Sequence, residues 1–146
     1  MHKFLFNYES NGVPIANSHE SKCLTFTSLL FMIPVIYGLI NGSPVLYSVI
    51  IFVTSILSYN HWKNPTYSIA RTADICYGTF TFCITFILGV SSVKMTLLFL
   101  FGVSLVVWCF MKSNNTYSDG YKYWYIYHMM FHMFSIICIL ITISAL

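Results

Sequence analysis

The chain has 146 residues, of which 58% are hydrophobic and only 8% are charged, and its mean hydropathy is +0.74. About a quarter of the residues in an ordinary soluble domain are charged. This composition therefore excludes a small soluble enzyme and a disordered segment. The seven Lys and Arg residues are scattered along the chain and form no basic cluster that could follow a phosphate backbone, so we expect no nucleic-acid partner. The composition is typical of a polytopic membrane protein embedded in the lipid bilayer.

Hydropathy predicts an all-α transmembrane bundle. Residues 1–23 are mixed and polar, so we expect a short tail there, followed by a single transmembrane domain over residues 24–146. Each predicted span approaches the ~20 residues that a bilayer requires. We expect the longest polar loop at residues 112–122. The five predicted spans cover residues 24–40, 45–60, 67–90, 95–111 and 121–146.

The positive charges predict the orientation of this bundle. Five spans place the two ends of the chain on opposite sides of the membrane. Every Lys and Arg except Lys94 then falls on the N-terminal side. Because short cytoplasmic loops carry an excess of Lys and Arg, we expect a cytoplasmic N-terminus. No feature of the sequence indicates the organelle.

Four ionisable side chains stand out because they lie within the apolar segments or at their ends. They are His61, Asp74, His128 and His132, from three different spans. Ionisable residues inside a membrane span cost about 2.5–3.5 kcal/mol each on insertion scales and are candidates for function. All four lie near the predicted cytoplasmic end of their spans. This coincidence predicts a functional site just below the cytoplasmic face.

The types and spacing of these residues favour a metal site. His128 and His132 are four residues apart, so they share one face of a helix. With His61 from another span they form a three-histidine set that leaves a fourth position for water, as in catalytic zinc sites. Zinc would lower the pKa of that water to about 7. Asp74, the only acid within the apolar segments, is the candidate to orient the water or carry its proton.

Simpler interpretations exist for each residue. His61 stands beside Trp62, and the two are compatible with an aromatic belt at the membrane interface. Asp74 could pair with Arg71, three residues earlier on the same helix. The two remaining histidines could serve packing or hydrogen bonding alone. These alternatives must all hold together to remove the predicted site.

Three segments of the chain resemble the CREST superfamily. Residues 123–134 (YWYIYHMMFHMF) resemble its last-helix HxxxH motif, residues 55–61 (SILSYNH) its second-helix motif, and residues 72–77 (TADICY) the start of its third helix. The superfamily includes alkaline ceramidases, adiponectin and progestin receptors, GPI-processing phospholipases and myomaker-like proteins. Two features differ from the family pattern. The family has seven spans, and its motif serine lies four residues before the histidine, whereas Ser58 lies three before His61.

The resemblance implies a ceramidase-like hydrolase of a lipid amide or ester. It implies a Zn²⁺ held by His61, His128 and His132, with water activated by the metal attacking the carbonyl carbon. Asp74 and Ser58 would be the catalytic residues beside that water. The expected partner is a membrane lipid substrate.

Three other functions fit the same sequence. One is a non-enzymatic member of the same superfamily, a receptor or fusion-type module with a structural zinc. Another is a haem-binding membrane cytochrome, because histidines from helices can ligate haem axially. The third is a channel or structural membrane protein. The lipid substrate and the oligomeric state are left open by the sequence.

Overall fold

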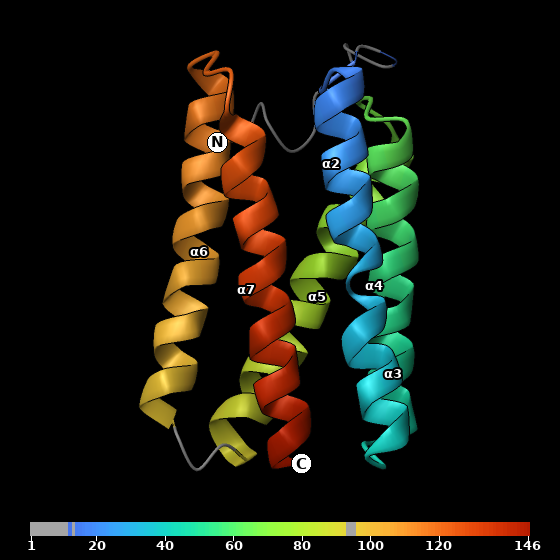
Figure 1. Ribbon diagram of the computed structural model, residues 1–146, viewed down its shortest axis with the longest axis vertical. Helices are drawn as coiled ribbons and strands as arrows, with labels where there is room; N and C mark the ends of the chain where they lie inside the picture. The colour runs from blue at the N-terminus through green and yellow to red at the C-terminus, as the bar shows by residue number, and fades with distance from the viewer. Residues whose placement is uncertain (1–11, 13, 93–95) are drawn as a thin grey trace.

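The computed structural model describes residue 12, residues 14–92 and residues 96–146 of the chain, and this part folds into a bundle of long helices (Figure 1). The helices, in chain order, are α2 (Ser18–Leu29), α3 (Met32–Ile40), α4 (Val45–Lys63), α5 (Ile69–Ser92), α6 (Thr96–Ser118) and α7 (Trp124–Ala145). Across the described residues, extended backbone pairs only at an isolated bridge between Pro14 and Thr66. Five helical segments, with α2 and α3 counted as one, are long and apolar enough to cross a membrane. The predicted five-span, all-α membrane architecture is confirmed.

The first span begins earlier than predicted. The side chain of Asn17 accepts hydrogen bonds from the backbone N–H groups of His19 and Glu20, and the Glu20 carboxylate accepts one from the N–H of Asn17. This reciprocal capping box satisfies donors that would otherwise be unpaired at a helix N-terminus. Residues 18–23 therefore belong to the first helix rather than to a polar tail.

The first span is broken near its middle, between α2 and α3. Pro34 has no N–H to donate, so the regular helical hydrogen-bond ladder cannot run through this region. Helix α4 covers the break, because the Ser55 hydroxyl donates to the Ser28 carbonyl oxygen at 2.9 Å. The Ser28 and Ser58 hydroxyls lie 2.9 Å apart. Small polar residues thus hold α2 close to α4, as is common between transmembrane helices.

Hydroxyl pairs also join α4 to α5. The Tyr47 hydroxyl lies 2.9 Å from Thr85 Oγ1, and Thr54 Oγ1 lies 2.7 Å from Thr81 Oγ1. All four side chains are buried. The polar side of α4 therefore faces the interior of the bundle, where its hydrogen bonds are satisfied.

Helix α6 extends two turns farther than predicted, so the expected polar loop at residues 112–122 is wrong. The helix ends at Ser118, and only residues 119–123 connect it to α7. Ser113 and Thr116 are buried, and the Thr116 hydroxyl donates to the Lys112 carbonyl oxygen at 2.7 Å. Polar residues can continue a helix beyond its apolar part when they pack against a neighbouring helix, and α6 packs extensively against α7.

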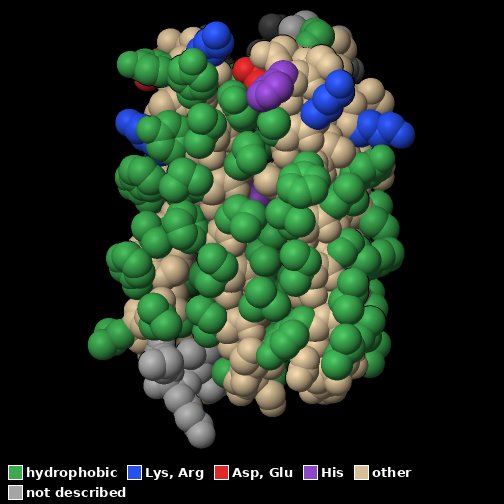
Figure 2. All heavy atoms as spheres, viewed as in Figure 1, with side chains coloured by type: hydrophobic (Ala, Val, Ile, Leu, Met, Phe, Trp, Pro, Cys, Tyr) green, Lys and Arg blue, Asp and Glu red, His purple; other side chains and the backbone are tan. Residues whose placement is uncertain are grey.

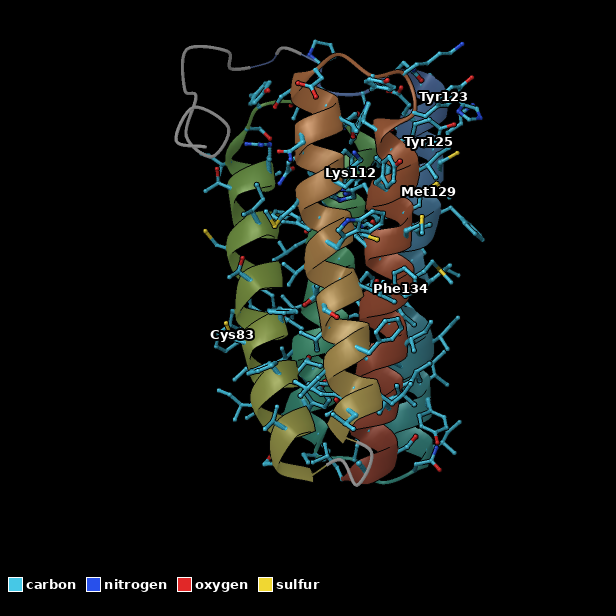
Figure 3. All side chains as sticks on the ribbon, turned by 90° about the vertical axis from the view of Figure 1, so that its left-hand side faces the viewer. Cys83, Lys112, Tyr123, Tyr125, Met129 and Phe134 are labelled. Atoms are coloured by element: carbon cyan, nitrogen blue, oxygen red, sulfur yellow. The ribbon has the colours of Figure 1, made fainter. Side chains whose placement is uncertain are left out.

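Charge is concentrated at one end of the bundle, which we call the polar end. It comprises the starts of α2, α5 and α7 and the ends of α4 and α6. Figure 2 shows Lys, Arg, acidic and His side chains there, above a surface dominated by hydrophobic side chains. Tyr123, which Figure 3 labels at this end, is exposed, and so is Tyr121 in the α6–α7 connection. The final residue, Leu146, lies at the opposite end.

Candidate functional site

A partly open cavity of about 280 Å³ lies between α4, α5, α6 and α7, and exposed side chains such as Phe86 and Val107 belong to its wall. It forms next to α5, which is the least buried of the five spans and packs less closely against α6 than against α4 and α7. Apolar side chains make up much of its wall, with Phe82 and Val106 among them. Four of the five residues predicted to form a site also line it, namely Ser58, Asp74, His128 and His132.

A second pocket, of about 50 Å³, adjoins the first on the side of the polar end. His61, the fifth predicted residue, lines this pocket. Asp74 and His128 line both cavities, so they stand where the two meet. The structure thus gathers all five residues around two adjoining cavities, with His61 and His132 in the walls of different ones.

His132 is held by a side chain from the first span. Its Nδ1 lies 2.9 Å from the hydroxyl oxygen of Thr27, and both residues are buried. The same hydroxyl lies 3.0 Å from the Leu24 carbonyl oxygen, which can only accept. A hydroxyl has one proton, so when it donates to Leu24 it accepts from Nδ1–H of His132. In this arrangement the Nε2 of His132 carries the free lone pair.

His128 lies one turn earlier on α7. Its ring centroid is 4.9 Å from that of His132 and 4.9 Å from the Trp62 ring. Its Nδ1 is 3.4 Å from the Ser113 hydroxyl, on the part of α6 that extends past the predicted end of the span. This contact is longer than that of Thr27 with His132, so Ser113 restrains the orientation of His128 more weakly.

His61 is buried together with its neighbour Trp62. Their exposed fractions are 2% and 4%, and their ring centroids are 4.4 Å apart. Both point into the bundle rather than outward, so the aromatic-belt interpretation does not apply to them. Within the described part of the chain, His61 Nδ1 is buried without a hydrogen-bond partner.

Asp74 on α5 and Ser58 on α4 belong to the wall of the larger cavity. The Ser58 hydroxyl lies 2.9 Å from that of Ser28. Arg71 is near enough to act electrostatically on the Asp74 carboxyl group, and Asp74 still lines both cavities. Asp74 is only partly buried in the fold because it borders both cavities.

The residue types at this site suit zinc. Their side chains, however, do not lie close enough together to bind one ion. Imidazole nitrogens are common zinc ligands, and a ligating histidine usually donates its other ring N–H to an oxygen, as His132 can donate to Thr27. The unpartnered His61 Nδ1 is a further available donor atom. However, no three His, Cys, Asp or Glu side chains among residues 12, 14–92 and 96–146 form a group that could hold a metal ion as they stand. The three imidazoles would have to move closer together to share one ion.

Sequence reasoning missed Thr27 and Ser113, the hydroxyls that contact the two histidines of α7. Thr27 carried a weak signal, since it is a polar residue inside an apolar segment. The sequence signal for Ser113 was weaker still, because Ser113 lies in the segment that was predicted to be a loop. Comparison of the chain with protein-family models, curated proteins and solved structures gives no match, so the CREST resemblance rests on the three motifs alone.

Proposed function

We propose that this protein is a zinc-dependent hydrolase that cleaves a lipid amide or ester inside the membrane. The observation that carries the proposal is the cavity of about 280 Å³, whose largely apolar wall includes Ser58, Asp74, His128 and His132. An acyl chain can be buried against such a wall, while the polar groups act on the carbonyl at its end. Few membrane proteins place titratable groups in an apolar chamber without a function for them.

Each polar residue has a defined task in this proposal. His61, His128 and His132 would hold the zinc after moving closer together, and Thr27 and Ser113 would orient two of the imidazoles. When bound, zinc supplies Lewis-acid chemistry that activates water and polarises the carbonyl. Asp74 would accept the proton of the attacking water and return it to the leaving group, with Ser58 beside it in the wall of the same cavity. One water adds per lipid, the C–N or C–O bond breaks, and a carboxylic acid and an amine or alcohol leave.

The proposal includes an orientation in which the polar end faces the cytoplasm. Within the described residues, the Lys and Arg side chains belong to the polar end and the turns next to it: Lys22, Lys63, Arg71, Lys112 and Lys122. The positive-inside rule supports a cytoplasmic location for this end. The proposed site would then lie just below the cytoplasmic face.

Substitution of the proposed proton carrier tests the function. Wild-type protein, Asp74→Asn and Asp119→Asn would be assayed with a long-chain ceramide and a long-chain acyl ester in mixed micelles. Asp119 is a matched control because it is an exposed acid in the α6–α7 connection. We expect turnover by wild type and by Asp119→Asn, and a loss of about 10²–10⁴-fold for Asp74→Asn.

Two outcomes would contradict the hydrolase proposal. One is equal turnover by Asp74→Asn and wild type, because Asp74 would then not be the proton carrier. The other is a wild-type protein that holds zinc but hydrolyses neither substrate, which favours the alternative of a receptor or fusion-type module with a structural zinc.

A further inference from the structure

The larger cavity is open on one side. Phe86 on α5 and Val107 on α6 belong to its wall, yet they are 39% and 43% exposed. The side of the cavity formed by α7 is closed, since Cys138 and Ile139 line it and each is only 3% exposed. Helix α5 also packs less closely against α6 than against α4 and α7. The opening therefore lies on the surface of the bundle, between α5 and α6.

This opening lies at the depth of the membrane interior. Val107 is the central residue of α6 (Thr96–Ser118), about 16 Å from each end of the helix. Thr79, an exposed residue that also lines the cavity, lies about 15 Å along α5 from the start of that helix. The hydrocarbon core of a bilayer is about 30 Å thick. Lipid chains rather than water therefore face the opening.

The opening results from the way in which α5 and α6 meet. At the end opposite the polar end, the buried ring of Phe99 packs on the backbone of Gly89 and fills the space between the two helices. Gly78 lies about three turns nearer the polar end, on the same face of α5. A Cβ added at Gly78 would meet no atom within 4 Å, and Gly78 lines the cavity. Figures 1 and 3 show the two helices diverging toward the polar end, so the space that Phe99 fills at one end is open at the cavity.

The hydroxyl groups in the cavity wall are compatible with a hydrocarbon chain. Those of Thr79, Thr85 and Ser135 each donate to a carbonyl oxygen of their own helix at 2.8 Å. A hydroxyl has one proton, so none of the three has a proton left for a ligand. A chain placed against them leaves no donor unpaired, whereas a carbonyl or phosphate group there would receive no hydrogen bond from them. The wall thus favours a hydrocarbon chain over a polar headgroup as the occupant.

We propose that an acyl chain of a bilayer lipid enters this cavity sideways, between α5 and α6, while its headgroup stays in the leaflet at the polar end. Asp74 and His128 stand at the end of the cavity nearest that leaflet, because they also line the small pocket on that side. Ile139 lies about 16 Å farther from the polar end along α7 than His128. The carbonyl at the head of the chain then arrives beside Asp74, and the end of the chain lies near Ile139. Entry of the chain does not depend on the proposed function, but its use as the route of a substrate rests on it.

Photolabelling from within the bilayer tests this route. The full chain in lipid nanodiscs would be given phosphatidylcholine with a diazirine near the end of one acyl chain, and mass spectrometry after irradiation would identify the labelled residues. We expect label on Cys138 and Ile139, which are buried from lipid outside the bundle and line the cavity. Ile143, which is similarly buried on the same helix but lies outside the cavity wall, should carry none.

Two substitutions should block the route. Val107→Trp narrows the opening from the side of α6, and Gly78→Leu places a side chain in the open space beside α5. Each should remove most of the label from Cys138 and Ile139. Met111→Trp is the matched control, because Met111 is exposed one turn from Val107 on the same face of α6 and does not line the cavity. It should leave the label unchanged.

The outcomes separate this proposal from the hydrolase proposal. Wild-type protein with no more label on Cys138 and Ile139 than on Ile143 overturns chain entry, and it is the result expected when a second copy or another helix covers the opening. Label that neither Val107→Trp nor Gly78→Leu reduces overturns the route between α5 and α6. Label with the expected response, in a protein that cleaves no lipid, supports chain entry and overturns the hydrolase proposal.

Discussion

Among single residues, Thr27 affects which ring nitrogen of His132 is available to a ligand. Its hydroxyl is positioned to accept from Nδ1, which leaves Nε2 as the nitrogen available to a ligand. Valine has nearly the same shape as threonine but no hydroxyl, so Thr27→Val removes this restraint and leaves packing largely unchanged. Outer hydrogen bonds of this kind typically contribute 10–100-fold in metal affinity.

We therefore expect Thr27→Val to weaken zinc binding about 10–100-fold. Competition with a chelator of known affinity measures the effect on purified protein. Thr25→Val is the matched control, since Thr25 lies on the same helix and makes no side-chain hydrogen bond within the described residues. Equal affinities for the two variants would mean that Thr27 does not position His132.

The residue types of the site could be predicted from the sequence, but their contacts could not. His61, Asp74 and the two histidines of α7 were recognisable because ionisable groups are costly in an apolar segment. Hydropathy alone could not pair Thr27 with His132, which are 105 residues apart. Nor could it place Trp62 inside the bundle, because tryptophan is equally common at membrane interfaces.

At the scale of elements, α5 and α6 are held together at the end of the bundle opposite the polar end. The Phe99 ring, which is fully buried, packs directly on the backbone of Gly89. A Cβ at Gly89 would overlap the ring atoms, so only glycine permits this approach. Nearer the polar end, Gly78 borders the cavity, and a Cβ added there would meet no atom within 4 Å.

Gly89→Ala should consequently lower the free energy of unfolding by about 1–3 kcal/mol, the usual cost of overpacking. Gly78→Ala should be neutral or slightly stabilising, because alanine is the better helix former and has room. Thermal unfolding in one detergent compares the two variants with wild type. A Gly89→Ala protein as stable as Gly78→Ala would show that α5 and α6 do not meet as described.

The boundaries of the elements were less predictable than their number. Apolar runs revealed five spans because the bilayer sets a minimum length. The start of α2 depends on a capping box at Asn17, and the end of α6 depends on packing of Ser113 and Thr116. Both are short-range polar contacts, which do not affect hydropathy averaged over a span.

At the scale of the whole molecule, an odd number of spans separates the polar end from Leu146. With the polar end in the cytoplasm, a reporter fused after Leu146 should lie on the other side of the membrane. Fusions of alkaline phosphatase and of green fluorescent protein test this, because each is active on one side only. A fusion after Asn64, in the α4–α5 connection, is the control for the cytoplasmic side. Fluorescence after Leu146 and phosphatase activity after Asn64 would reverse the orientation.

In the proposed function, three histidines from two separate spans bind one zinc ion. Metal analysis of detergent-purified protein tests it most directly, with His132→Ala and the exposed His19→Ala purified in parallel. We predict about one zinc per chain in wild type and in His19→Ala, and its loss in His132→Ala. Wild-type protein without zinc, or zinc retained in full by His132→Ala, would mean that these histidines do not form a zinc site.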